Sequence, residues 1–168
     1  MNPVRHGLAV ALVAAAAGLA HAQPPVEVAF GELAKFTDLR VSIMTDDRDR
    51  ASLAQDLRNH LERKAPAHLP PGTRLAVSIL DVDMAGEYPP ITGSLSRDLR
   101  VIKDVYPPRI ELDFRLLRAD GTVEREGQRK LRDTAFLWQS GSFGANDILR
   151  YEKNLLDGWL RREFGPAR

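Results

Sequence analysis

Three carboxylates near the end of one apolar run are the residues best suited to chemistry. Asp81 and Asp83 stand two positions apart, and Glu87 follows shortly after. Oxygen ligands spaced in this way can bind a hard cation such as calcium, and paired carboxylates can serve a metal-assisted or acid–base hydrolase. An EF-hand loop is excluded, because a loop that begins at Asp81 has Ala85 at position 5 and Thr92 at position 12.

A structural alternative explains the same acids. In an extended strand Asp81 and Asp83 lie on one face, where two nearby carboxylates repel each other unless a cation compensates them. Basic side chains of neighbouring strands can supply that charge, and the candidates are Arg109, Arg125 and Arg129. We favour this charge cluster over a metal site, and we predict no cofactor.

A ligand groove is a second possibility. Tyr88 and Tyr106 each precede two prolines, and Arg109 follows the second pair. Aromatic and proline surfaces offer rigid contact area to an extended ligand, and Arg125 and Arg129 could add an anion-binding patch. The alternatives are structural, because prolines also mark the beginnings of strands and long arginine stems cover apolar surface at a sheet edge.

Nucleophilic and zinc chemistry find little support. The chain has no cysteine and no G-x-S-x-G motif. After residue 22 only two histidines remain, His60 in a predicted helix and His68 in a proline-rich turn. Two histidines without cysteine do not suggest a zinc site, so we interpret both as structural or solvated.

Residues 106–129 carry the clearest structural pattern. Apolar and charged residues alternate from 109 to 116, as in a half-buried strand, and Asp120-Gly121 suits a tight hairpin turn. A two-residue loop at this turn predicts three facing pairs: Glu111 with Lys130, Arg115 with Glu126, and Phe114 with Gly127.

Two other segments are predicted to be strands, and two are predicted to be helices. Residues 26–30 predict a short strand, and Leu75 to Met84 is apolar on both alternating faces, which predicts a central strand. Leucines at every fourth position from Leu53 predict a helix that Pro66 ends, and a last helix is expected after a cap at Asn146 or Asp147. We therefore expect an α+β fold, a mostly antiparallel sheet of four or five strands packed against two helices in two layers.

The first 22 residues predict a secretory signal peptide. An apolar run from Leu8 to Ala20 precedes Ala20-His21-Ala22, which fits an A-x-A cleavage site. The run is shorter than the roughly 18 apolar residues that span a membrane. We expect residues 23–168 to form a single globular domain in the periplasm or the medium, with no integral membrane segment after cleavage.

The charge balance argues against a nucleic-acid partner. The chain has 24 basic residues, of which cleavage removes Arg5, so that 23 remain against 23 acidic residues. A mature chain with no net charge lacks the positive footprint that binds a phosphate backbone.

Several stretches resemble an uncharacterised family of proteobacterial exported proteins, the domain of unknown function 3016. They are FTDLR from Phe36, LPPGTRLAVSILDVDMAGE from Leu69, VYPPRIELDF from Val105, LRD from Leu131 and RYEKNLLDGWLRREF from Arg150. The resemblance implies one exported domain and gives no residue a role. We predict an exported, non-enzymatic binding or envelope-accessory protein, whose partner is an unknown envelope protein or a small ligand. The alternatives are the hydrolase that uses Asp81, Asp83 and Glu87, and a structural envelope protein.

Overall fold

A computed structural model describes residues 24–88, 99–138, 143–144 and 146–167. The predicted signal peptide and part of the connection that contains Tyr88 and Tyr106 lie outside these residues. The strands are β1 Val26–Phe30, β2 Arg74–Asp83, β3 Arg109–Leu117 and β4 Val123–Arg132; the helices are α1 Asp47–Lys64 and α2 Arg150–Phe164. Three 3-10 turns lie at Leu33–Lys35, Ala65–His68 and Phe136–Trp138.

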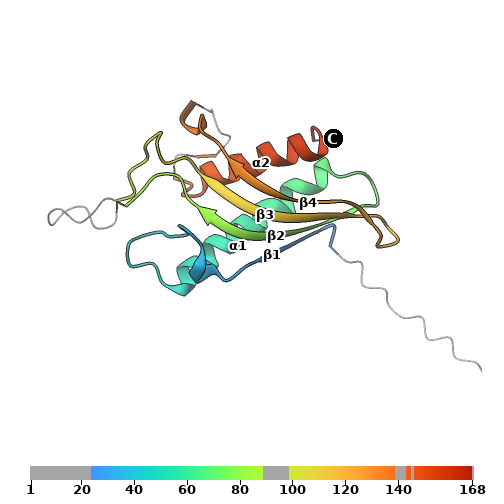
Figure 1. The fold of residues 1–168 in the computed structure, drawn as a ribbon, viewed down its shortest axis with the longest axis horizontal. Helices are drawn as coiled ribbons and strands as arrows, with labels where there is room; N and C mark the ends of the chain where they lie inside the picture. The colour runs from blue at the N-terminus through green and yellow to red at the C-terminus, as the bar shows by residue number, and fades with distance from the viewer. Residues whose placement is uncertain (1–23, 89–98, 139–142, 145, 168) are drawn as a thin grey trace, which may run out of the picture.

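The four strands form one open sheet in the order β1-β2-β3-β4. Strands β1 and β2 run parallel because α1 crosses over between them, and the other two neighbouring pairs are antiparallel. Both helices cover the same face of the sheet, and the opposite face carries no helix among the described residues (Figure 1). The predicted two-layer α+β fold with a mostly antiparallel sheet is therefore confirmed.

The β3–β4 hairpin has the predicted register, with Glu111 opposite Lys130, Arg115 opposite Glu126 and Phe114 opposite Gly127. The loop that produces it is different from the expected one. The turn closes between Arg118 and Thr122 around Gly121, whose φ is 83°, and the register shifts by one residue between Leu116 and Leu117. A longer loop plus a bulge thus gives the same facing pairs as a two-residue loop.

Strand β2 is central, but it is not apolar on both faces as predicted. A bulge between Ile79 and Asp81 leaves Leu80 unpaired and 39% exposed. Because the extra residue reverses the alternation, Val82 and Met84 turn to the helix-covered face and are buried there with Ile79. Asp81 and Asp83 share one face, as the sequence predicted, and the bulge makes this the open face rather than the face of Ile79.

Helix α1 begins where its acidic start predicts. The Asp46 side chain accepts from the backbone N–H groups of Arg48 and Asp49, and the Asp49 side chain accepts from the Asp46 N–H, which forms a capping box. Leu53, Leu57 and Leu61 are buried. Helix α2 begins later than predicted, at Arg150, because Asp147 uses its side chain in a turn that binds the Leu149 N–H.

Candidate functional site

Each of the three carboxylates proposed for chemistry is bonded to the protein. Asp81 accepts from the Thr37 N–H and the Thr37 hydroxyl, each at 2.7 Å. Asp83 pairs with Arg109 at 3.6 Å, and Glu87 accepts from Lys103 at 2.8 Å. Among the described residues no three His, Cys, Asp or Glu side chains gather as metal ligands would. Of the three arginines expected to compensate the aspartates, Arg109 pairs with Asp83, whereas the partner of Asp81 is the neutral Thr37 and that of Glu87 is Lys103.

The environments of these acids differ. Burial raises the pKa of Asp83, although the nearby Arg109 acts against this shift. The hydrogen bond from Lys103 lowers the pKa of Glu87, with a further contribution from Tyr106. Neither arrangement brings Glu87 and the two aspartates together around one reacting atom.

A second group of side chains lies at the end of β2, and we call it the end cluster: Asp38, Tyr88, Arg100 and Glu152. The two carboxylates and the Arg100 side chain are buried, and Tyr88 is half-buried. Arg100 donates from Nη1 and Nη2 to the Asp38 carboxylate at 3.0 and 2.9 Å, and its side chain is only 8% exposed. The guanidinium lies 4.6 Å from the centre of the Tyr88 ring. Asp38 also accepts from Arg40 at 2.9 Å. Two cations thus compensate one buried carboxylate.

Backbone contacts connect this pair to the sheet. Asp38 forms a parallel bridge with Asp83, and Arg100 Nη1 also donates to the carbonyls of Met84, Ala85 and Gly86. Arg100 therefore joins the segment after β1 to the chain leaving β2. Its bonding pattern is that of a structural residue.

Glu152 of α2 completes the end cluster. Its side chain is buried and accepts from the Ala85 N–H at 2.8 Å. Burial raises the pKa of Glu152 to about 7, against the opposing effects of that hydrogen bond and of Arg100. Its second oxygen, Oε2, has no hydrogen-bond partner among the described residues. Glu152 is closed off from solvent, so it cannot exchange a proton with a substrate.

The structure does not assemble the five predicted ligand residues into one site. Tyr106 contacts the chain leaving β2 through its carbonyl, which accepts from the Gly86 N–H, whereas Tyr88 contacts Arg100. Arg109 stands nearby at the start of β3 on the open face. Arg125 and Arg129 project from β4 to the other face.

On that face Arg125 and Arg129 contact α2. Arg129 binds the Glu163 carboxylate through Nε at 2.8 Å and Nη2 at 3.0 Å and lies over the Phe114 ring. Arg125 donates to the Glu163 carbonyl and lies over Phe164. Neither arginine reaches Asp81 or Asp83, so these stems cover apolar surface while their charged ends anchor the helix.

The two histidines are buried between the helices. His60 Nε2 lies 2.7 Å from an Asp157 oxygen, and His68 Nδ1 lies 2.7 Å from the Gly165 carbonyl. His60 links α1 to α2, and His68 links the 3-10 turn after α1 to the residue that follows α2. Both side chains are buried, which supports a structural role over a solvated one.

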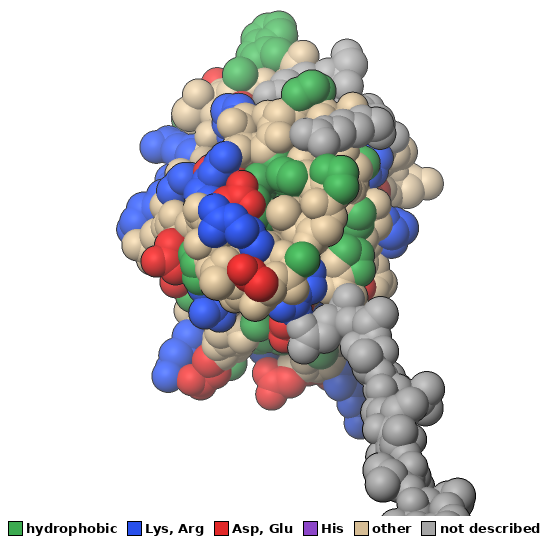
Figure 2. All heavy atoms as spheres, turned by 90° about the vertical axis from the view of Figure 1, so that its right-hand side faces the viewer, with side chains coloured by type: hydrophobic (Ala, Val, Ile, Leu, Met, Phe, Trp, Pro, Cys, Tyr) green, Lys and Arg blue, Asp and Glu red, His purple; other side chains and the backbone are tan. Residues whose placement is uncertain are grey.

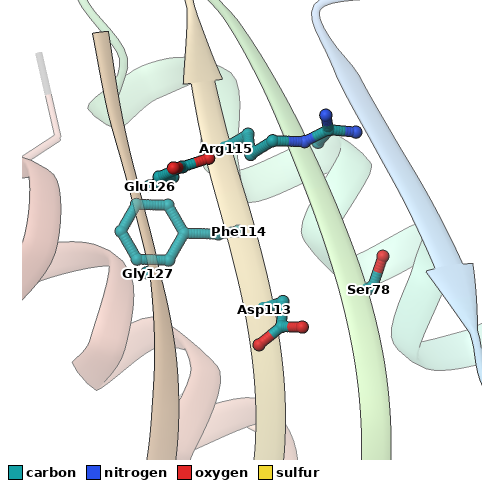
Figure 3. Close-up of a pocket in the computed structure, with 7 residues that line it drawn as sticks. Ser78, Asp113, Phe114, Arg115, Glu126 and Gly127 are labelled. Carbon is teal, nitrogen blue, oxygen red and sulfur yellow. The ribbon is translucent and has the colours of Figure 1, made fainter. Parts of the chain in front are cut away.

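A shallow depression of about 450 Å³ lies on the open face of the sheet (Figure 3). We call it the open-face depression; its residues are Ala76, Ser78, Asp113, Phe114, Arg115, Glu126 and Gly127. The small side chains of Ala76 and Ser78 on β2 leave the hollow. In Figure 3 the Arg115 guanidinium reaches across β2 toward β1, whereas Asp113 and Glu126 lie over β3 and β4.

The charged side chains of this depression are free. Within the described part of the chain, neither Asp113, Arg115 nor Glu126 has a hydrogen bond or an ion pair, and all three are exposed. Sequence reasoning placed these residues on the outer face of the hairpin but missed the site, since the small residues of β2 that form its floor come from a distant segment.

Basic and acidic side chains are intermixed on the face shown in Figure 2, so this face carries no patch of a single charge sign. None of the helices among the described residues is long and apolar enough to cross a membrane. The combination defines a small two-layer α+β domain with one sheet face open.

The chain belongs to the family described as protein of unknown function (DUF3016), whose model matches residues 24–162. This confirms the resemblance found in the sequence. Comparisons with curated proteins and with solved structures found no match. The family covers the whole sheet and nearly all of α2, and it assigns no activity.

Proposed function

We propose that this chain is an exported, non-enzymatic binding protein that holds a small zwitterionic molecule, such as a free amino acid or a short peptide, in the open-face depression. Three features support the proposal: the free charges of the depression, its size, and the signal-peptide pattern of residues 1–22. Small-molecule sites commonly occupy some 300–1,000 Å³.

The arrangement of charge carries the proposal. Arg115 presents a planar donor group that matches a carboxylate, and it points toward β1 (Figure 3). Asp113 and Glu126 lie on the other side and can accept from an ammonium group. A ligand lying across the strands would place its anionic end over β2 and its cationic end over β3 and β4. Ser78 adds a hydroxyl between them.

A hydrolase is the weaker candidate. Asp81, Asp83 and Glu87 are each bonded to a different partner, Thr37, Arg109 and Lys103 respectively. A general acid or base must reach the reacting group, and a hydrolytic pair must act on one bond. The three acids do not converge in this way.

A thermal-shift comparison tests ligand binding. The probes are free amino acids and unblocked dipeptides, each paired with its N-acetylated and amidated form, which lacks both charges. Unblocked probes should raise the melting temperature, because a ligand that binds only the folded chain stabilises it. Arg115→Met should abolish the rise, whereas Arg48→Met, an exposed arginine of α1, should retain it. Equal shifts with blocked probes would refute a zwitterion site.

Export is tested separately by intact-mass measurement on the soluble periplasmic fraction. Cleavage after Ala22 should leave Gln23, or its cyclised form, as the N-terminus. A chain that keeps Met1 and sediments with membranes would contradict export.

A further inference from the structure

Strand β4 is a long free edge. It is the last strand in the sheet order, it has ten residues, and Leu131 is its one buried side chain. No described element pairs with its outer side. An edge of this length offers unpaired backbone groups to a second strand.

The open-face side chains of β4 have an antisymmetric charge pattern. Two acids come first and two bases last, with a neutral residue in the middle: Glu124, Glu126, Gln128, Lys130 and Arg132. Glu124 is the extra residue of the hairpin bulge and lies 3.8 Å from Arg118, so Glu126, Gln128 and Lys130 form the regular part of the pattern. In an antiparallel pair of identical strands centred on Gln128, each acid faces a base of the other copy. A parallel pair would place like charges side by side.

We propose that two copies of this chain associate through β4, antiparallel, with Gln128 opposite Gln128 of the second copy, so that the two sheets become one continuous sheet. Glu126 then faces Lys130 of the second copy, and Glu124 faces Arg132. A copy of the same strand is the partner that supplies this reversed pattern, which favours it over an unrelated peptide.

The neighbouring strand extends the charge pattern. Lys130 already binds Glu111 of β3 at 2.9 Å, and Glu126 lies opposite Arg115. Across the proposed contact one row would read Glu111, Lys130, then Glu126 and Arg115 of the second copy, with the sign alternating at each step. The second copy would thus bring a Lys130 to the rim of each open-face depression.

Arg132 gives an independent indication. It lies opposite Arg109 in the hairpin register, and like charges that face each other destabilise a sheet. No ion pair to an acid is present for Arg132 among the described residues. Glu124 of a second copy, which pairs only loosely with Arg118 of its own chain at 3.8 Å, would supply a negative charge to Arg132.

One contact must yield for the strands to pair. Arg129 donates from Nη1 to the Gln128 carbonyl at 2.9 Å, and this carbonyl must be available to the second copy. A strand N–H of the second copy would replace this donor. Arg129 would keep its bonds from Nε and Nη2 to Glu163.

Single-cysteine cross-linking tests the pairing, because the chain contains no cysteine of its own. Facing residues of an antiparallel pair have Cα atoms about 4.5–5.5 Å apart, which a disulfide can bridge. Gln128→Cys should therefore form a covalent dimer under mild oxidation or with a short bis-maleimide. Gln55→Cys, which replaces a glutamine of α1 that is also exposed, is the matched control and should cross-link at least tenfold more slowly.

A mixing experiment determines the register. Glu126→Cys and Lys130→Cys should each cross-link slowly alone and rapidly when mixed, while sedimentation of the unmodified protein should show a dimer. The proposal is overturned if Gln128→Cys cross-links no faster than the control, or if the mixture of Glu126→Cys and Lys130→Cys cross-links no faster than either variant alone. Either result stands independently of ligand binding, since no probe is present.

Discussion

Two regions of this molecule combine an arginine with carboxylates, and they differ in how fully the arginine is bonded. In the end cluster Arg100 is buried and donates to Asp38 and to backbone carbonyls. In the open-face depression Arg115 is exposed and, within the described residues, bonded to nothing. The charges of the end cluster are compensated within the chain, whereas those of the open-face depression remain available to the proposed ligand.

The difference follows from desolvation. A buried ion pair loses water on both partners, and it is tolerated only when further hydrogen bonds replace that water. Arg100 meets this requirement and so fixes the chain leaving β2. Arg115 keeps its water, so a ligand can displace it at little cost in folding stability.

The largest expected effect separates the two arginines. Arg100→Met leaves Asp38 buried with only Arg40 as a cation and should lower the free energy of unfolding by about 3–5 kcal/mol. Arg115→Met should change it by no more than about 0.5 kcal/mol. Urea unfolding of both variants measures these two changes in the free energy of unfolding. Equal losses of stability would contradict the difference between the two arginines.

Glu152 of the end cluster should make the stability of the protein depend on pH. Its carboxyl titrates near pH 7 when folded and near its ordinary value of 4.5 when unfolded. Between these values the folded state holds more protons, so stability contributed by this group is present below pH 4.5 and is lost as pH rises to 7. Glu152→Gln removes that loss.

We therefore compare the free energy of unfolding of Glu152→Gln with that of the wild type. The value of the variant minus that of the wild type should increase by about 3 kcal/mol as pH rises from 4.5 to 7.5. Subtracting the wild-type value removes the effect of every other titrating group, because both proteins contain those groups. A difference that stays constant with pH would show that folding does not shift the pKa of Glu152, and Asp113→Asn on the open face serves as the control.

Arg109 should fall between the two extremes. Its ion pair with Asp83 is long, at 3.6 Å, and its side chain is 51% exposed. Exposed pairs contribute about 0.2–1 kcal/mol, so Arg109→Met should cost that amount and should raise the pKa of Asp83 further. Proton titration of Asp83 by NMR checks the second part. A loss as large as that of Arg100→Met would place Arg109 in the end cluster.

The sequence predicts those parts of the fold that depend on short-range patterns. The hairpin register follows from alternation and a turn, and the leucines of α1 follow from a period of four. The bulge at Leu80 does not, because both Val82 and Met84 fit either face. Its position depends on contacts with the segment around Asp38, which comes from more than forty residues earlier.

The candidate site was harder to predict for the same reason. Arg100 and Asp38 are 62 positions apart, and no local pattern pairs them. The depression requires Ala76 and Ser78 of β2 to lie beside Asp113 and Arg115 of β3, with both helices on the other face. Alternation gives the face of each residue, but only the packing of both helices on one side shows that this face is open.

The most direct test of the account is amide chemical-shift mapping with an unblocked dipeptide. The account predicts that glycylglycine shifts the amides of Ser78, Asp113 and Arg115, that Arg100 and Glu152 stay unchanged, and that Arg115→Met removes the response. Shifts confined to Tyr88, Arg100 and their neighbours would contradict it, because the end cluster would then be the binding site and the open face would not.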